Sequence, residues 1–415
     1  MDNRITGLVM TGGGARAGYQ AGVLRAVAKI RRDCDAPPDN PFQVLAGTSA
    51  GAINAAVLAC GAHEFDKSVV GLNYIWKHFH ADQVYRADSI GVIRTGARWL
   101  TMMSLGWMLA RWRRMRPRSL LDNSPLRELL HEYLPMQRIR DNLRDGHLRA
   151  LAVTASSYGS GQHVTFFESA HGMTPWIRTQ RLAAPQEITV DHLLASSAIP
   201  FIFPAVSLSM GERTEYFGDG SMRQSAPISP AIHLGADRIM VIGSGRMHEP
   251  PPPPGGREGS SEYPNLAQIA GHALSNIFLD ALAVDVERLQ RINNTLSLLP
   301  TEIRAKTNLR PLELLVISPS QRLDDIAAQH LNSLPTPIRA LLRGMGVSGK
   351  GSDARGAALA SYLLFEEPYT RELIKLGEAD TMARRAEVIK FFNWERRTVA
   401  RQVEHQVDFD DSAFE

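Results

Sequence analysis

The sequence begins with short apolar runs, each followed directly by a stretch with helical periodicity. Residues 5–10 form a compact apolar run, and apolar side chains then recur with helical spacing over 19–30. The same order returns where the apolar run 42–46 precedes 52–59, a stretch typical of a helix. Buried strands that lead directly into helices are the building units of α/β folds. The pattern therefore predicts an α/β protein.

Further strands and helices are predicted beyond the first sixty residues. Two paired strands are expected at 150–155 and 162–167, around the turn residues 157–161. The sequence also predicts a buried strand at 237–243, a long helix at 266–292 and a late strand at 311–318 that joins the same sheet. Helices are expected at 353–364, 370–376 and 381–404.

Ser49 lies between two glycines, Gly47 and Gly51, in a G-x-S-x-G pattern. The pattern follows a predicted strand and precedes a predicted helix, which is the context of a nucleophile elbow. A serine at such a turn projects its hydroxyl from the edge of the sheet, and flanking glycines permit close backbone approach. Ordinary strand–helix turns share this composition, so a catalytic role needs support from further motifs.

Gly12, Gly13 and Gly14 follow the first predicted strand and precede the first predicted helix. Three consecutive glycines leave backbone N–H groups open around a small volume. Such a cluster suits an anion, either a phosphate or the oxyanion of a tetrahedral acyl-transfer intermediate.

The same loop has a second interpretation as a dinucleotide-binding fingerprint, with Gly12, Gly14 and Ala17 at its small-residue positions. That fingerprint requires an acidic residue about 20 positions further on, at the end of a second strand. Asp33 and Asp35 fall near that distance but lie in a predicted loop. The cofactor interpretation is therefore the weaker of the two.

Asp219 lies between Gly218 and Gly220, in a tight loop expected at 215–221. An Asp-Gly pair alone is a common turn signal. It becomes informative in the order glycine-rich loop, G-x-S-x-G serine, D-G aspartate. The three motifs together resemble those of the patatin-like phospholipases, and the resemblance covers residues 5–245.

The resemblance implies a role for each matched residue. In that family the serine is the nucleophile, the aspartate is its base without a histidine, and a GGGxR loop forms the oxyanion hole. The implied fold is a three-layer α/β/α arrangement with a mainly parallel central sheet, and the implied reaction is lipid ester hydrolysis without metal or cofactor. Carried onto this sequence, the nucleophile is Ser49, the base is Asp219, and the oxyanion loop is Gly12, Gly13, Gly14 and Arg16.

Two positions depart from the family pattern. Ala17 and Gly18 stand in exchanged order relative to bacterial members, and Ser221 follows Asp-Gly where glycine or alanine is usual. Neither change removes a catalytic group. An aspartate is a poor base unless burial raises its pKa, and the apolar run that ends at Phe203 is expected to supply such surroundings.

A Ser-His-Asp lipase is an alternative, because the chain contains 13 histidines. The α/β-hydrolase fold places several strands before its nucleophile and its histidine last. Ser49 comes too early for that arrangement. His233 and His248 are expected on the surface or in loops.

Composition limits the remaining classes. The 415 residues are 44% hydrophobic and 21% charged, which is ordinary for a soluble protein. Cys34 and Cys60 make neither a disulfide framework nor a metal set, which fits a reducing cytoplasm. Met1 is followed almost directly by the first predicted strand, so no secretory signal is expected. A net charge of +3 gives no reason to expect a nucleic-acid partner.

The charge is unevenly distributed along the chain. No acidic residue occurs between Asp88 and Asp122, and this segment holds an apolar run, 99–110, shorter than the roughly 20 residues that span a bilayer. Two interpretations are equally favoured: an interfacial helix on an anionic membrane, or a helix that caps the active site with its arginines reaching outward. The predicted membrane contacts are Trp99, Trp107, Arg111, Trp112, Arg113 and Arg114.

The expected organisation is an acyl hydrolase domain over 1–320 followed by a helical C-terminal extension over 321–415. The first part includes the basic insertion 89–121 and a Pro/Gly-rich loop, 249–262. The extension is expected to serve docking or formation of a homodimer. Residues 348–352 are glycine-rich and basic but follow no strand, so a hinge is favoured over a phosphate loop.

Two classes of function remain open. The first is a serine acyl hydrolase that acts on phospholipids or related lipid esters. The second is a non-catalytic or regulatory protein of the same fold that binds lipid or a membrane. Intact Ser49, Asp219 and the glycine loop favour the enzyme. The predicted location is the cytoplasm, with peripheral contact to an anionic membrane surface.

Overall fold

A computed structural model of the chain describes residues 4–86, 119–170, 172–222, 224–247, 263–347 and 356–395. The predicted membrane contacts, the Pro/Gly-rich loop and the predicted hinge at 348–352 lie outside the described residues. Cys34 and Cys60 are separate free thiols.

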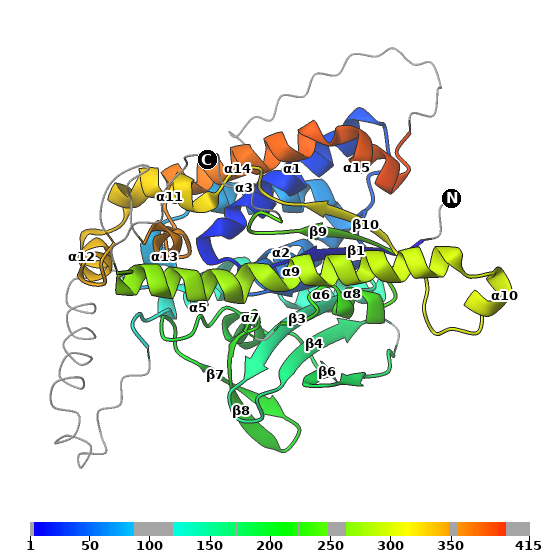
Figure 1. Ribbon diagram of the computed structural model, residues 1–415, viewed down its shortest axis with the longest axis horizontal. Coiled ribbons are helices and arrows are strands. Elements are labelled where there is room, and N and C mark those ends of the chain that lie inside the picture. Colours follow the sequence, from blue (N-terminus) through cyan, green and yellow to red (C-terminus); the bar gives the residue numbers. More distant parts are fainter. Residues whose placement is uncertain are drawn as a thin grey trace.

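A ten-stranded mixed sheet with the strand order β10-β9-β1-β2-β3-β4-β6-β5 forms the centre of the molecule (Figure 1). Its neighbouring strands β10, β9, β1, β2 and β3 are all parallel. The carboxyl ends of these strands therefore share one edge of the sheet, and the loops after β1 and β2 meet there. The bounds are β10 (Glu313–Ile317), β9 (Arg238–Ile242), β1 (Thr6–Met10), β2 (Val44–Thr48) and β3 (Ala150–Ser157).

The second half of the sheet is partly antiparallel. β4 (His163–Ser169) pairs antiparallel with β3, which confirms the predicted strand pair at 150–155 and 162–167. The sheet continues through β6 (Arg181–Pro185) to the short β5 (Ile177–Arg178).

The segment that ends at Asp219 is a strand, where the sequence predicted a tight loop. β8 (Arg213–Asp219) pairs along its length with β7 (Val206–Met210), and its last residues pair antiparallel with β3. Phe217 is buried whereas Tyr216 is exposed, the alternation expected of a strand with one buried face. In the sequence, Gly218 and Gly220 on either side of Asp219 obscure this alternation. The turn begins only after β8 ends at Asp219.

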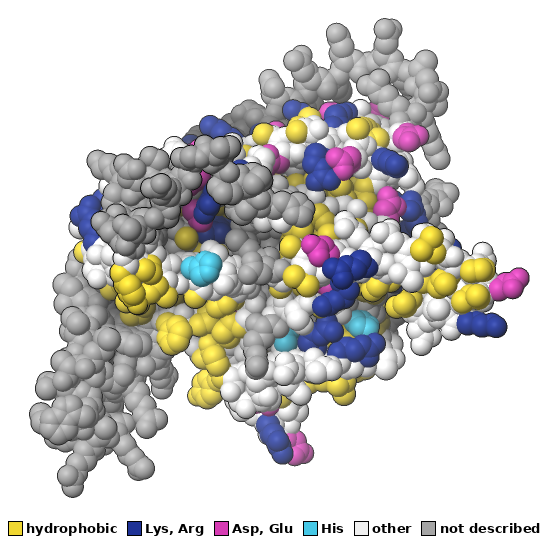
Figure 2. Space-filling view, viewed as in Figure 1, with side chains coloured by type: hydrophobic (Ala, Val, Ile, Leu, Met, Phe, Trp, Pro, Cys, Tyr) yellow, Lys and Arg dark blue, Asp and Glu magenta, His cyan; other side chains and the backbone are white. Residues whose placement is uncertain are grey.

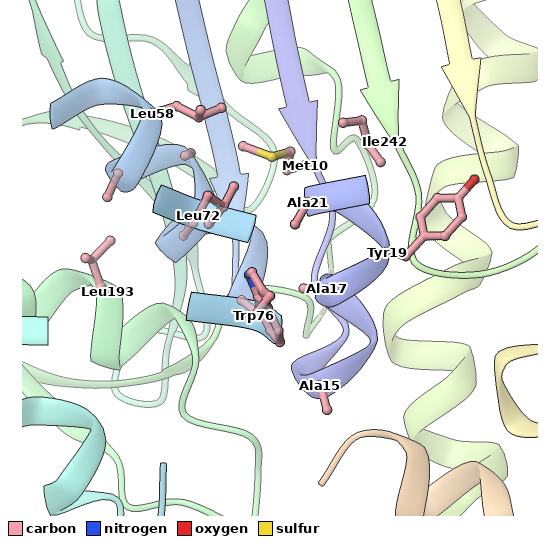
Figure 3. Close-up of a cluster of buried hydrophobic side chains, with 14 of the residues drawn as sticks. Met10, Ala15, Ala17, Tyr19, Ala21, Leu58, Leu72, Trp76, Leu193 and Ile242 are labelled. Carbon is pink, nitrogen blue, oxygen red and sulfur yellow. The ribbon is translucent and has the colours of Figure 1, made fainter. Parts of the chain in front are cut away.

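One face of the sheet is covered by helices from the N-terminal part of the chain. α1 (Gly18–Asp33), α2 (Ala50–Cys60) and α3 (Phe65–Lys77) bury their apolar sides in one cluster, which also contains Met10 of β1. Figure 3 shows Met10 among buried side chains of α1 and α3, Trp76 included.

The opposite face is covered by α8 (Ser229–His233) and the long helix α9 (Leu266–Leu298). Val9, which follows Leu8 in β1, points to this second cluster, so both faces of the sheet are buried. Helices on both faces and the mainly parallel sheet confirm the three-layer α/β/α fold (Figure 1).

Helix α9 extends beyond the predicted 266–292, because the next proline occurs only at Pro300. Of the described helices, it alone is long and apolar enough to cross a membrane by length and composition. Leu282 and Val286 nevertheless pack on the sheet, so α9 is a layer of this fold. The face that carries α9 shows apolar side chains interspersed with charged ones (Figure 2).

The C-terminal helix α14 (Glu367–Ala383) packs tightly along α1. A Cβ at Gly22 of α1 would collide with the carbonyl of Ile374, and one at Gly377 of α14 with the carbonyl of Tyr19. The predicted domain boundary at 320 stays a prediction. The other helices of the described residues are η1 (Gly14–Ala17), η2 (Ala62–Glu64), η3 (Ala81–Gln83), α5 (Ser124–Tyr133), α6 (Gln137–Arg144), α7 (Val190–Ser196), α10 (Thr301–Arg304), α11 (Leu323–His330), η4 (Leu331–Ser333), α12 (Thr336–Gly344), α13 (Ala357–Ser361) and α15 (Arg385–Phe392).

Candidate active site

Ser49 occupies a sharp turn between β2 and α2. Its backbone angles, φ 56° and ψ −131°, lie in a strained region that is found mainly at functional sites. A Cβ at Gly47 would collide with the backbone of Ala52, and one at Gly51 with the carbonyl of Met10. Both glycines are therefore needed for β1, β2 and α2 to approach this closely, and the turn has the form of a nucleophile elbow.

The hydroxyl of Ser49 lies against the carboxylate of Asp219. Oγ of Ser49 donates a hydrogen bond of 2.6 Å to Oδ2 of Asp219, and both residues are buried. The two segments meet because each borders β3: Thr48 lies beside Thr154, and Asp219 beside Ala155. The structure thus brings together the serine and the aspartate that the sequence motifs single out, at the separation a nucleophile and its base require.

Burial makes Asp219 a stronger base than an ordinary aspartate. Loss of solvation raises the pKa of Asp219 to about 6, although hydrogen bonds from Ser49 and Ser221 act in the opposite direction. The Ser221 amide donates to Oδ1 at 2.8 Å, and any residue except proline can make that contact. Serine at this position is therefore compatible with the aspartate's surroundings. At neutral pH the carboxyl group is mostly ionised and still has a pKa near the working pH.

The glycine loop runs from β1 to η1 beside Ser49. Gly14 and Ser49 line the same pocket. Gly14 has a φ of 56°, and a Cβ there would collide with the carbonyl of Tyr362, so only glycine fits. No group among the described residues accepts a hydrogen bond from the amide of Gly12 or Gly13. Among the described residues, these two amides are therefore left as hydrogen-bond donors without an acceptor.

Arg16, the fourth residue predicted in this loop, is engaged elsewhere. Its guanidinium is buried and bonds to Ser361 and Asp324, and its amide donates to the carbonyl of Gly13 at 3.1 Å. Arg16 therefore supports the loop from inside the protein.

Ser196 and His163 are buried, belong to none of the sequence motifs, and hold the backbone near Ser49 and Asp219 in place. Oγ of Ser196, in α7, accepts a hydrogen bond of 2.8 Å from the Ser49 amide and donates one of 2.6 Å to the carbonyl of Thr154. Nε2 of His163 donates to the carbonyl of Gly220 at 2.7 Å, and burial lowers the pKa of His163 to about 4. The supporting role of these residues can be recognised only from their tertiary contacts, because a lone serine or histidine forms no motif in the sequence.

The histidine alternative has little support from the described residues. His233 stacks on Trp176, with 4.6 Å between ring centroids, and His248 lies outside the described residues. The hydroxyl of Ser49 is bonded to a carboxylate rather than to an imidazole.

The dinucleotide alternative is not supported by the position of Asp33. This residue ends α1 and forms an ion pair of 2.9 Å with Arg385. The second strand begins only at Val44 and ends at Thr48, so no acidic side chain closes it, as a ribose-binding site requires.

An apolar pocket opens beside Ser49. The cavity volume is about 70 Å³. The polar Asn54 in its wall is satisfied by the Trp76 indole and by Gln20, each at 2.9 Å. The pocket is thus suited to a hydrocarbon group. Its apolar lining includes Ile53, Val57, Leu72, Ile75, Trp76, Phe79, Leu126, Leu129, Leu130, Phe203 and Phe365.

The described residues that flank the segment 87–118 lie near this pocket. Val84, shortly before it, lines the pocket. Shortly after it, the amide of Leu120 donates to the carbonyl of Phe201 at 2.8 Å, two residues before the pocket residue Phe203. The described residues on either side of the basic segment therefore lie next to the candidate site.

Comparison with known proteins places these residues in a wider context. A family model described as patatin-like phospholipase matches residues 8–232, while a search of the curated proteins finds no match. The chain spans 60% of the length of human GIVD cytosolic phospholipase A2. Similar solved structures are human GIVD cytosolic phospholipase A2 (12% identity, TM-score 0.46, 94% of this chain and 60% of that chain), VipD from Legionella pneumophila (12%, 0.29, 90% and 67%) and the type III effector protein ExoU (14%, 0.27, 96% and 90%).

Proposed function

Because the chain belongs to the patatin-like phospholipase family, a family of lipid hydrolases, we propose that it is a serine acyl hydrolase that cleaves ester bonds of phospholipids or related lipids. The observation that carries the proposal is the 2.6 Å hydrogen bond between Ser49 and the buried Asp219 beside an apolar pocket.

In the acylation step, Oγ of Ser49 attacks the ester carbonyl carbon while its proton passes to Oδ2 of Asp219. The carbonyl oxygen becomes an oxyanion, and the open amides of Gly12 and Gly13 are the donors assigned to it. The tetrahedral intermediate then collapses, and the leaving alcohol takes the proton from Asp219. The product of this step is an acyl ester on Ser49.

Deacylation repeats the same steps with water as the nucleophile. Asp219 takes a proton from the water molecule, whose oxygen attacks the acyl ester on Ser49. Collapse of the second intermediate returns the proton to Ser49 and releases a fatty acid. This sequence requires no metal or cofactor.

The apolar pocket supports a lipid substrate. Its lining by leucine, isoleucine and aromatic side chains from α2, α3 and α5 suits an acyl chain. Ser49 lies at the pocket wall, so a carbonyl carbon at the end of a bound chain can reach its hydroxyl.

Turnover by the wild-type protein separates this proposal from the non-catalytic alternative. We expect hydrolysis of a short p-nitrophenyl ester and of phospholipid in mixed micelles. Binding of lipid without release of fatty acid would favour the non-catalytic function. A cytoplasmic location and a homodimer through the C-terminal helices stay predictions from the sequence.

The pH dependence of the reaction follows from Asp219. Its carboxylate form is the base, and its pKa is raised to about 6, so kcat/KM should rise about tenfold per pH unit below that value and level off above it. Burial lowers the pKa of His163 and of His192 to about 4, so neither accounts for a midpoint near 6. The profile is measured with the short ester. A profile that stays flat from pH 5 to 8 would contradict the assignment of Asp219 as the base.

Membrane contact through the basic segment is a second part of the proposal. Replacing Arg111, Arg113 and Arg114 by glutamine should weaken binding to anionic vesicles, since each arginine near such a surface contributes roughly 1 kcal/mol. Binding by the wild type should also fall with added salt, because the screening length shortens from about 10 Å at 0.1 M to about 3 Å at 1 M. Hydrolysis of the short ester should be retained. Sedimentation with phosphatidylserine vesicles measures the binding.

A matched triple variant provides the control for charge alone. Arg144, Arg288 and Arg291 are exposed arginines of the described helices α6 and α9, and their replacement by glutamine should leave vesicle binding largely intact. Unchanged vesicle binding in the first triple variant would contradict membrane contact by the basic segment. Equal loss on soluble and vesicle substrates would favour the capping helix instead.

A further inference from the structure

The glycine loop is held by a part of the chain far beyond the family region. The carbonyl of Tyr362 accepts a hydrogen bond of 3.1 Å from the amide of Ala15. The same carbonyl lies so close to Gly14 that it leaves no room for a Cβ there. Residue 362 therefore contacts the loop directly, although the family model ends at residue 232.

The side chain of Arg16 ties the loop to the same region. Its Nε donates to Oγ of Ser361 at 2.8 Å, and its Nη2 bonds to Oδ1 of Asp324. Its guanidinium carbon also lies 3.9 Å from the ring centroid of Tyr362. We refer to Arg16, Asp324, Ser361 and Tyr362 as the loop clamp.

Arg16, Ser361 and Tyr362 of the loop clamp are buried, and Asp324 is 20% exposed. Arg16 is 2% exposed and Ser361 is fully buried, so the guanidinium has lost its water and depends on these partners. Ser361 is itself fixed, because its Oγ donates to the carbonyl of Ala358 at 2.6 Å. The backbone of η1 is thereby held in one position relative to α11 and α13.

The clamp adjoins the groups that the mechanism needs most accurately placed. Gly12 and Gly13 precede Arg16 in the same short loop, and the Arg16 amide donates to the carbonyl of Gly13. A shift of Arg16 would move this carbonyl and with it the neighbouring amides. Hydrogen bonds to an oxyanion depend steeply on their geometry.

We propose that the loop clamp positions the oxyanion donors, so that turnover depends on Asp324 and Ser361, which lie outside the family region. The inference rests on the hydrolase function proposed above. Arg16, Asp324 and Ser361 are positioning residues, because they act through the loop without contact to the reacting atoms.

The test compares kcat and KM for the short ester in Asp324→Asn and Ser361→Ala, each assayed well below its own melting temperature. Displacement of the donors should lower kcat by about 10- to 100-fold, while KM stays within about twofold because the pocket is unchanged. The midpoint of the pH profile should stay near 6, since Asp219 is untouched. A role in stability alone would lower the melting temperature without changing kcat of the folded protein.

Arg322→Gln is the matched control. Arg322 is half exposed and lies 3.8 Å from the other carboxylate oxygen of Asp324, so this change keeps the buried contact and should keep wild-type kcat. If Asp324→Asn fails to fold, Ser361→Ala tests the inference, because this change removes one hydroxyl group and leaves the ion pair between Arg16 and Asp324 in place. Wild-type kcat in a folded Asp324→Asn or Ser361→Ala protein would overturn the inference. An inactive wild type would instead contradict the proposed function.

Discussion

Replacement of Ser49 by alanine is expected to lower hydrolysis of a short p-nitrophenyl ester by roughly 10⁴-fold or more. The hydroxyl is the proposed nucleophile, and its Oγ is the atom bonded to Asp219. The fold should persist, because the amide of Ser49 keeps its hydrogen bond to Ser196. Steady-state turnover and a thermal melt measure the two effects.

Ser68→Ala is a matched control for this change. The Ser68 hydroxyl donates to the carbonyl of Val57 and has no contact with Asp219, so turnover should stay at the wild-type level. Wild-type turnover in Ser49→Ala would show that another group carries the reaction.

Asp219→Asn is expected to lower kcat by roughly 10³- to 10⁴-fold, because an amide cannot accept the proton of Ser49. The melting temperature at pH 8 should equal or exceed that of the wild type. Burial disfavours the ionised carboxyl group, and asparagine removes that penalty. The double variant should be no less active than Ser49→Ala, since the two residues act as one unit.

Asp285→Asn separates the catalytic effect from the loss of a buried carboxylate. Asp285 of α9 is also buried, and its Oδ2 accepts a hydrogen bond of 3.0 Å from the Ile228 amide. An asparagine oxygen can accept the same bond, so kcat should be unchanged. If Asp219→Asn kept more than about a tenth of wild-type kcat, Asp219 would not be the base.

The sequence predicted the central part of the fold well because its signals are local. The apolar runs at 5–10 and 42–46 form β1 and β2, and the late run at 311–318 forms β10 at the edge of the same sheet. β1 and β2 are fully buried and β10 is partly buried, and each is a short apolar run bounded by polar or turn residues. The strand β8 was missed because glycines near its end carry a strong turn signal.

The candidate site was predictable where a motif marks it. Ser49 follows a strand and precedes a helix, and the D-G motif marks Asp219 in the expected order. Their contact depends on β3, which separates the two strands and brings both residues to one edge of the sheet. The order of strands in a sheet is a tertiary property that local patterns do not encode.

The supporting residues were not predictable for the same reason. Arg16 and Asp324 are 308 positions apart, and neither has a sequence neighbour that indicates the other. The apolar side chains of α3 and α5 have ordinary helical spacing, which indicates burial without indicating that they line a pocket. Contacts of this kind follow from packing between elements rather than from the pattern within one element.

The central claim is that Ser49 is the nucleophile activated by Asp219. It is tested most directly by labelling the wild-type protein with a serine-directed fluorophosphonate and locating the adduct by peptide mass spectrometry. The account predicts a single adduct on Ser49, with labelling greatly slowed in Asp219→Asn. An adduct on another serine, or labelling of Asp219→Asn at the wild-type rate, would contradict it.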